Sequence, residues 1–157
     1  MECVILAAGS SSRLGMDKAL VNVGSQTLIS WISRRLSSRV ANITIVANES
    51  NFAEISKIVS DVNVILNRNP HEGRTGSLKV GIDSIDSSRV EDYRLLVVPV
   101  DRPGFSDSTL DHLICSEETC CPMKEGRGGH PNADFRRCRQ GKEKFSKFTI
   151  ERSNRGK

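Results

Sequence analysis

The residues best suited to chemistry lie in a short polar loop that follows an apolar segment near the amino terminus. Residues 9–18 combine glycines and serines with two cations, Arg13 and Lys18. Small residues leave backbone N–H groups accessible, so an anionic phosphate can approach the loop closely. Arg13 and Lys18 add positive charge at the two ends of the loop, where the oxygens of a triphosphate would bind. The spacing matches neither a Walker loop nor the dinucleotide fingerprint, and a plain strand-to-helix turn with surface charges stays an alternative.

A carboxylate follows the most apolar segment of the chain. Residues 94–100 lead directly into Asp101, and Pro103 follows two residues later. Ligands of open α/β sheets bind at the carboxyl ends of the strands, so we expect Asp101 to share an edge with residues 9–18. A carboxylate that faces a triphosphate suits Mg²⁺, which binds one or two carboxylates together with phosphate oxygens. The alternative is an aspartate that only caps the turn before Pro103.

Two further polar segments are candidates for ligand contact. Residues 67–78 contain Asn67, Gly73 and Ser77 ahead of a helical pattern. Such a loop can present backbone groups to a ligand at the start of a helix, although an ordinary capped loop has the same composition. His130 lies among glycines and before a proline. A lone histidine is more often structural than catalytic, so we assign it no proton transfer.

The apolar residues alternate between short continuous runs and segments of helical period. Continuous runs are typical of strands that are buried on both faces of a parallel sheet. Strands are predicted at residues 2–8, 42–47, 62–66, 94–100 and 131–135, and helices at 27–36, 51–60, 77–85 and 106–114. Asn51 or Ser50 is expected to cap the second helix. The alternation predicts an α/β domain with a mostly parallel sheet, and it leaves the strand order open.

Length and composition limit the classes of function. The 157 residues suffice for one domain with a sizeable core. Aromatic residues make up 4% of the chain, which argues against a base-stacking platform for nucleic acid. The opening residues do not resemble a signal peptide, and no stretch approaches the roughly 20 apolar residues of a membrane span. We therefore expect a cytoplasmic protein without membrane contact.

Basic residues are concentrated at the carboxyl end. Residues 136–157 contain nine lysines and arginines against two acids, Glu143 and Glu151, which gives this tail a formal charge of +7. Since the whole chain carries +4, residues 1–135 carry −3. This contrast divides the chain into a globular domain over residues 1–135 and a basic tail over residues 136–157. A solvated tail is the simpler interpretation, and contact with nucleic acid or anionic ligands is the alternative.

The cysteines do not form a metal or disulfide pattern. No C-x-x-C pair or zinc-like spacing with histidine occurs among Cys3, Cys115, Cys120, Cys121 and Cys138. We expect buried small hydrophobes or free thiols, and the redox state of Cys120 and Cys121 stays open.

The loop sequence resembles that of a known family. The pattern L-A-A-G-x-S-x-R-L-G-x-x-K-A-L over residues 6–20 looks like the signature loop of the MobA-like NTP transferases. These enzymes make nucleotide forms of the molybdenum cofactor and are relatives of the sugar-phosphate nucleotidyltransferases. The resemblance implies a Rossmann-like three-layer fold of the nucleotide-diphospho-sugar transferase type, with an NTP held under the loop in residues 1–135. The nucleotide-binding residues that it implies are Leu6, Ala7, Ala8, Gly9, Ser10, Arg13, Lys18, Asn67, Gly73, Ser77 and Asp101.

The same resemblance implies a reaction. P-V-D-x-P at residues 99–103 is similar to the family's metal-binding motif, which makes Asp101 the expected ligand of a Mg²⁺ cofactor. The expected catalytic residues are Arg13, Lys18 and Asp101. An acceptor phosphate oxygen would attack the α-phosphorus of the NTP in line and release pyrophosphate. Because a phosphate monoester is already ionised near neutral pH, positioning and charge neutralisation would suffice without a strong general base.

Two motifs concern the substrates. G-x-x-x-S-L-x-x-G at residues 73–81 resembles the cytidylyl branch of the family, so we expect CTP to be favoured, with GTP as the alternative. G-x-x-G-H-P at residues 126–131 resembles a turn near the acceptor site, which places His130 beside a phosphorylated small molecule, molybdopterin in this family.

The resemblance covers residues 1–135. Members of the family generally continue with a late strand and an aspartate-rich segment that often supplies a second metal carboxylate, whereas Glu143 and Glu151 lie in no such motif. Three alternatives therefore stay open: an enzyme that works as a homo-oligomer or with a partner subunit, a catalytically weak nucleotide-binding module, and a protein that associates with nucleic acid through its basic tail.

Overall fold

The chain folds around a five-stranded sheet with the order β5-β4-β1-β6-β9. The computed structural model describes residues 1–9 and 16–136. The sheet strands are β1 (Glu2–Leu6), β4 (Asn42–Ala47), β5 (Asn63–Leu66), β6 (Tyr93–Pro99) and β9 (Asn132–Arg136). The first four run parallel, and β9 pairs antiparallel with β6 at one edge. The prediction of a mostly parallel sheet is confirmed.

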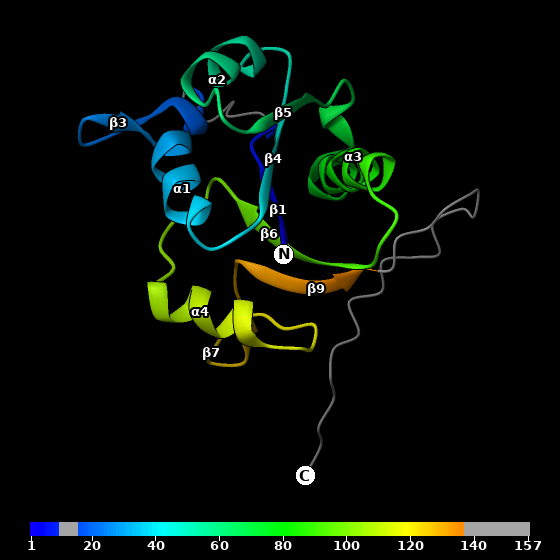
Figure 1. The fold of residues 1–157 in the computed structure, drawn as a ribbon. Helices are drawn as coiled ribbons and strands as arrows, with labels where there is room; N and C mark the ends of the chain where they lie inside the picture. The colour runs from blue at the N-terminus through cyan, green and yellow to red at the C-terminus, as the bar shows by residue number, and fades with distance from the viewer. Residues whose placement is uncertain (10–15, 137–157) are drawn as a thin grey trace.

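Helices cover both faces of this sheet and complete three layers (Figure 1). Helices α1 (Leu28–Ser37), α2 (Phe52–Ile58) and α4 (Asp107–Cys115) pack on one face, and α3 (Gly73–Ser88) packs on the other. Strand β1 is buried on both sides, because Cys3 and Ile5 join the core under α1 while Val4 and Leu6 join the core under α3. A strand with two buried faces has no polar side to show, which explains its continuous apolar sequence.

Hydroxyl caps begin two of the helices. The Oγ1 atom of Thr27 accepts a hydrogen bond from the Ser30 amide at 3.4 Å at the start of α1. The Oγ atom of Ser106 accepts one from the Thr109 amide at 3.1 Å at the start of α4. Each cap satisfies an amide that has no partner inside its own helix.

Helix α3 is longer than the predicted 77–85, since it extends over Gly73–Ser88. Ser77 therefore lies in the second turn of the helix, where its hydroxyl donates to the carbonyl of Gly73 at 3.1 Å. This bond to the carbonyl four residues earlier is typical of a serine inside a helix. Gly73 and Gly76 weaken the apolar period, which is why the sequence pattern misses the first turn. Gly73 has a φ of 71° and begins α3 directly after the 3-10 helix η2 (Pro70–Glu72).

Two short hairpins have no counterpart in the predicted elements. They are formed by β2 (Asn22–Val23) with β3 (Gln26–Thr27), and by β7 (Met123–Lys124) with β8 (Arg127–Gly128). Strands of two residues are too short for any periodic pattern to detect. No helix within residues 1–9 and 16–136 has the length and apolar character to cross a membrane.

Replacing Gly81 by valine should destabilise the fold, because α3 touches the sheet at this residue. A Cβ atom at Gly81 would lie 2.8 Å from Cγ1 of Val4 and 3.2 Å from Cγ2 of Val46. We expect urea unfolding to show a loss of at least about 2 kcal/mol for Gly81→Val. A Cβ atom at Gly104 would meet no atom within 4 Å, so Gly104→Val should change the unfolding free energy by no more than about 0.5 kcal/mol. Equal losses in the two variants would contradict a close contact at Gly81.

Candidate functional site

The parallel register places four residues in one row at the carboxyl edge of the sheet. Leu6 pairs with Val46 and with Pro99, and Ala47 pairs with Leu66. Counting on from these pairs aligns Ala8, which follows β1, with the residues that follow β4, β5 and β6. From β5 to β6 the row therefore reads Asn67, Asn48, Ala8 and Asp101.

Backbone hydrogen bonds hold this row in place. The amide of Asn67 donates to the carbonyl of Ala47 at 2.8 Å, and the amide of Val100 donates to the carbonyl of Leu6 at 3.1 Å. The pairing of the strands thus continues past their ends. Asp101 therefore follows β6 at the edge of the sheet at which β1 ends. That it lies beside residues 9–18 stays a prediction, because residues 10–15 lie outside the described residues.

The chain changes from buried to exposed where the glycine-rich loop begins. Ala7 and Ala8 are buried, whereas Gly9 is exposed and a Cβ atom there would meet nothing within 4 Å. The loop ends at the 3-10 helix η1 (Lys18–Leu20), which Lys18 opens. The predicted ligand residues Ser10 and Arg13 lie outside the described residues.

Two buried asparagines hold the loop ends, and neither was predicted from the sequence to belong to the site. The Nδ2 atom of Asn51 donates to the carbonyl of Ala7 at 3.0 Å and to Oδ2 of Asp17 at 2.7 Å. The Nδ2 atom of Asn48 donates to the carbonyl of Ala8 at 3.4 Å. Asn51 occupies the N-cap position of α2, as predicted, although its side chain makes no capping hydrogen bond.

The side-chain amide of Asn67 connects the end of β5 to α3. Asn67 is 1% exposed, and its Nδ2 atom donates to Oγ of Ser77 at 3.1 Å. Ser77 in turn donates to the carbonyl of Gly73, so the three predicted ligand residues Asn67, Gly73 and Ser77 form one hydrogen-bonded group. The structure therefore brings them together at the start of α3.

Asp101 lies in a turn directly after β6 and is exposed. The amide of Arg102 closes this turn on the carbonyl of Pro99 at 3.2 Å. The other carboxylate near the row, that of Asp17, already accepts from the Ala19 amide at 2.8 Å and from Asn51. No group of three or more histidine, cysteine, aspartate or glutamate side chains that could hold a metal occurs in the part of the chain that the structure describes.

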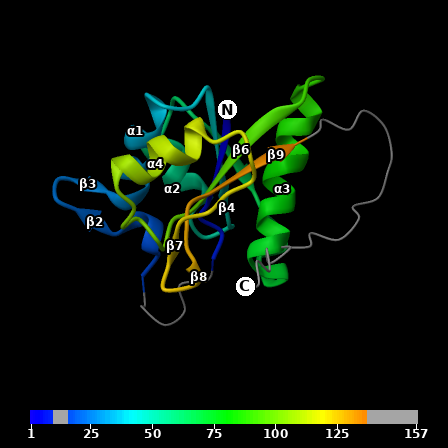
Figure 2. The same ribbon diagram turned by 90° about the horizontal axis from the view of Figure 1, so that it is seen from below.

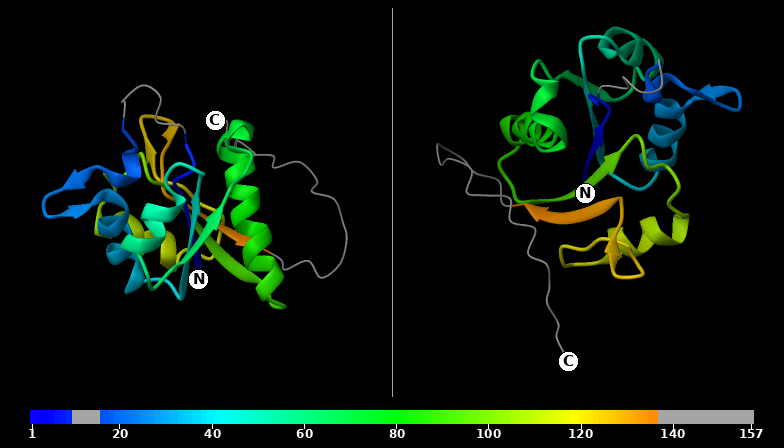
Figure 3. Two further views of the ribbon diagram at one scale, coloured as in Figure 1. Left: turned by 90° about the horizontal axis from the view of Figure 1, so that it is seen from above. Right: turned by 180° about the vertical axis from the view of Figure 1, so that it is seen from behind.

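His130 lies between β8 and β9 and contacts the first turn of α3. Its Nε2 atom is 3.0 Å from Nη1 of Arg74. Because a guanidinium only donates, Nε2 accepts and the proton of the neutral ring is on Nδ1, which is buried and has no partner among the described residues. Figure 2 and the left view of Figure 3 show the β7–β8 hairpin at the end of the molecule opposite the amino terminus.

Charges at this end of the molecule act on the imidazole. Burial lowers the pKa of His130, the positive charges of Arg74 and Arg102 lower it further, and the negative charge of Asp101 opposes them. The neutral ring is thus favoured over the imidazolium.

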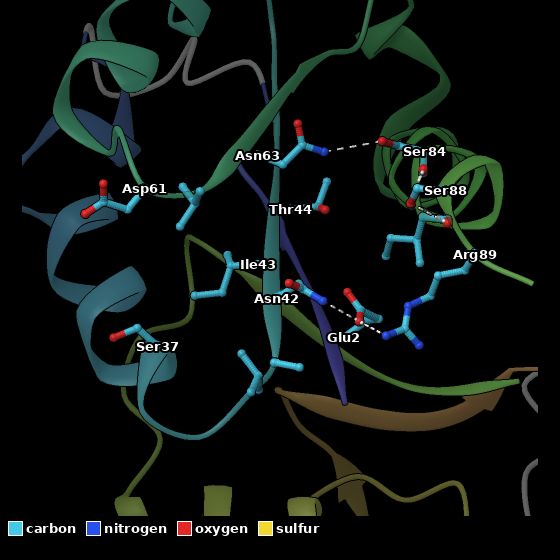
Figure 4. A pocket seen from close by; sticks show the side chains of 14 residues that line it. Glu2, Ser37, Asn42, Ile43, Thr44, Asp61, Asn63, Ser84, Ser88 and Arg89 are labelled. Atoms are coloured by element: carbon cyan, nitrogen blue, oxygen red, sulfur yellow. Dashed lines mark hydrogen bonds and ion pairs between the residues drawn. The ribbon is translucent and has the colours of Figure 1, made fainter. Parts of the chain in front are cut away.

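A cavity of about 500 Å³ lies at the opposite, amino end of β4 and β5 (Figure 4). Its buried carboxylate is that of Glu2, which accepts from Nδ2 of Asn42 at 2.8 Å and pairs with Nη2 of Arg89 at 3.0 Å. These contacts join β1 to β4 and to the end of α3. The cavity contains none of the predicted site residues, and the paired Glu2 side chain is structural.

The four described cysteines are free thiols, in agreement with the prediction. Burial, together with the neighbouring charge of Glu2, raises the pKa of the Cys3 thiol far above its ordinary range. Cys3 therefore acts as a small core hydrophobe. Cys138 lies outside the described residues.

Acidification should destabilise the wild-type protein more than a His130→Gln variant. The folded state lowers the pKa of His130, so the unfolded chain binds a proton more readily. The resulting stability is present above the ordinary pKa of histidine and is lost as the pH falls through the lowered pKa of the folded protein. Melting temperatures measured between about pH 7.5 and pH 5 should therefore diverge. Parallel pH profiles of the two proteins would contradict the lowered pKa.

Known proteins resemble the chain in sequence and in structure. It matches the MobA-like NTP transferase domain over residues 3–154, which extends past residue 135. It is 30% identical to the molybdenum cofactor guanylyltransferase of Vibrio atlanticus over 125 residues, 78% of this chain and 56% of that protein. The chain thus spans little more than half the length of this curated relative.

Solved structures share the fold. A nucleotidyl transferase from Methanothermobacter thermautotroptrophicus superposes with a TM-score of 0.62 at 23% identity, covering 85% of this chain and 70% of that one. A 4-diphosphocytidyl-2C-methyl-D-erythritol synthase superposes with a TM-score of 0.62 at 17% identity, covering 85% and 73%. The predicted nucleotide-diphospho-sugar transferase fold is confirmed. Because the domain match covers nearly the whole chain, this protein belongs to the family of MobA-like NTP transferase domains.

Proposed function

We propose that this protein binds a nucleoside triphosphate at the carboxyl edge of its sheet and transfers the nucleotidyl group to a phosphorylated acceptor, with release of pyrophosphate. The observation that carries the proposal is the row Asn67, Asn48, Ala8 and Asp101, which aligns the predicted loop and the predicted metal ligand. Membership of the family supports it.

The phosphates would bind between the end of β1 and η1. We assign backbone contacts to Ala8 and Gly9, since the exposed Gly9 leaves room for an anion beside the buried strand end. Leu6 and Ala7 would support these contacts from within the sheet, because the amide of Ala7 already donates to the carbonyl of Val46 at 2.9 Å. Lys18 would neutralise phosphate charge from the far end of the loop, and Ser10 and Arg13 are assigned by the family pattern alone.

The residues present fit a magnesium ion that arrives with its nucleotide. Asp101 is exposed at the row, and Mg²⁺ commonly binds one or two carboxylates together with substrate phosphates. When bound, the ion would neutralise charge on the phosphates. Asp101 would orient it, whereas we assign Asp17 to holding the loop end through its hydrogen bonds with the Ala19 amide and with Asn51.

We propose GTP as the donor nucleotide and molybdopterin as the acceptor. The matching curated relatives are named molybdenum cofactor guanylyltransferases, and they do not support the CTP preference expected from residues 73–81. The hydroxyl of Ser77 is engaged by Asn67 and Gly73. We therefore assign Ser77 and Asn67 the role of shaping the base-binding loop at Gly73.

His130 would contribute to the acceptor side of the site. Its neutral ring carries a buried N–H group without a partner among the described residues. Such a group can donate a hydrogen bond to an oxygen of the acceptor substrate. No proton transfer is needed from it, because an ionised phosphate oxygen is already a nucleophile.

Lys18→Ala and Asp101→Asn should have different effects. Loss of a cation that contacts phosphate should weaken triphosphate binding by at least about tenfold, since charge-assisted bonds contribute about 1.5–3 kcal/mol. Asp101→Asn keeps the shape and removes the charge, so it should nearly abolish pyrophosphate release with Mg²⁺ while changing nucleotide affinity less. Calorimetry and a pyrophosphate assay with purified acceptor measure the two effects.

Three outcomes would change this assignment. Unaltered affinity in a folded Lys18→Ala protein would remove Lys18 from the site. Normal turnover of Asp101→Asn at limiting Mg²⁺ would reduce Asp101 to a turn residue. Tight nucleotide binding without pyrophosphate release would instead indicate a nucleotide-binding module.

Competition among nucleotides tests the choice of base. With Mg²⁺ present, GTP should displace a fluorescent triphosphate at a concentration at least about tenfold lower than CTP, a difference of about 1.4 kcal/mol. ATP and UTP serve as controls for binding through the phosphates alone. A preference for CTP would contradict the assignment of GTP and favour the cytidylyl branch of the family. The proposed phosphate and metal contacts would be unaffected.

A further inference from the structure

One buried side chain joins the two ends of the glycine-rich loop. The Nδ2 atom of Asn51 donates to the carbonyl of Ala7 at 3.0 Å, and to Oδ2 of Asp17 at 2.7 Å. Ala7 follows β1 before the loop, and Asp17 precedes Lys18 after it. We call this contact of Asn51 with Ala7 and Asp17 the Asn51 bridge.

The hydrogen bonds of the bridge allow only one orientation of the amide. Asn51 is completely buried, and its Oδ1 atom accepts from the backbone amide of Asn48 at 2.9 Å. An asparagine has two N–H donors, and both point to acceptors here. A reversed amide would bring its oxygen against a carbonyl and a carboxylate. Electrostatic repulsion between these oxygens therefore adds to the packing that holds the side chain in its orientation.

Asp17 passes this restraint to Lys18. Its Oδ2 atom is bound to Asn51, and its Oδ1 atom accepts from the Ala19 amide at 2.8 Å and caps η1. The backbone of Lys18 lies between these contacts. Both carboxylate oxygens of Asp17 are therefore used to hold the first turn of η1 against the end of β1.

We infer that Asn51 is a positioning residue for triphosphate binding. Through Asp17 it fixes Lys18 relative to the end of β1, so that the cation is held in place before the phosphates arrive. A cation positioned in advance saves the cost of ordering its segment on binding. This inference rests on the proposed function and adds a residue that itself makes no contact with the ligand.

Asn51→Asp tests the bridge, because it keeps the shape and replaces the donor by a second carboxylate beside Asp17. We expect the Kd for inorganic triphosphate and for GTP to rise by at least about tenfold. The exchanged pair Asp17→Asn with Asn51→Asp restores a hydrogen bond between the two positions with donor and acceptor reversed. It should therefore recover part of the lost affinity, although the bond to Ala7 stays lost.

Two further variants separate positioning from folding. Asn42→Asp is the matched control, because Asn42 also donates to a carboxylate at 2.8 Å, that of Glu2, at the opposite end of the sheet. It should leave the Kd unchanged even where it lowers the melting temperature. Asp17→Ala removes the other partner at a partly exposed position and should weaken triphosphate binding as Asn51→Asp does.

The outcomes distinguish this inference from the proposed function. Wild-type protein that binds neither inorganic triphosphate nor GTP would refute the proposed function. Normal wild-type binding with an unchanged Kd in Asn51→Asp and Asp17→Ala would overturn the positioning role alone. Equal loss of affinity in Asn42→Asp would also overturn it, because the effect would then follow stability and not the bridge. Faster hydrogen exchange of the Ala19 amide in Asn51→Asp without ligand would support it.

Discussion

The site depends on the parallel pairing of β1 with both of its neighbours. Leu6 is paired with Val46 on one side and with Pro99 on the other, so the ends of three strands lie at one level. A shift of one residue in either pair would exchange the side chains that face α1 with those that face α3, and the close packing of both layers opposes it. The same packing that makes the core therefore also determines which residues reach the edge. Asn48, Ala8 and Asp101 follow the strands at the same edge because the packed apolar residues before them fix the register.

Polar side chains then connect the segments that leave this edge. The amides of Asn51 and Asn67 are almost completely buried, and each donates to groups from another part of the chain. A buried amide without partners is costly, so a fully paired one restricts the backbone around it to one arrangement. The loop before η1 and the start of α3 are held in this way. The proposed phosphate contact at the exposed Gly9 thus lies next to buried polar contacts.

Much of the fold could be predicted from local patterns. The continuous apolar runs located β1, β4, β5 and β6 to within about two residues, because strands buried on both faces contain little else. The register that brings Asp101 to the glycine-rich loop follows from the parallel arrangement. Helix α3 was predicted too short, since its first turn contains two glycines that interrupt the apolar period.

The Asn51 bridge could not be predicted in this way. Asn51 has the sequence context of a helix cap, and its real partners lie 44 and 34 residues away. Such contacts appear only when β1 and β4 are paired and the loop is closed. The hydrogen bond between Ser77 and Asn67 could not be predicted for the same reason, because Asn67 follows another strand.

Among the described residues, α3 is the one helix on its face of the sheet, and it is held at both ends. Ser77 is bound to Asn67 near the first turn, and Arg89, directly after the last turn, is paired with Glu2. Between these contacts Gly81 lets the helix lie directly on Val4 and Val46. A helix of 16 residues is about 24 Å long and stiff on this scale, so it connects the two ends of the sheet as one rigid element. The Asn67–Ser77 bond and the Glu2–Arg89 pair thus hold one stiff helix at opposite ends of the sheet, and the helix keeps the distance between these two contacts constant.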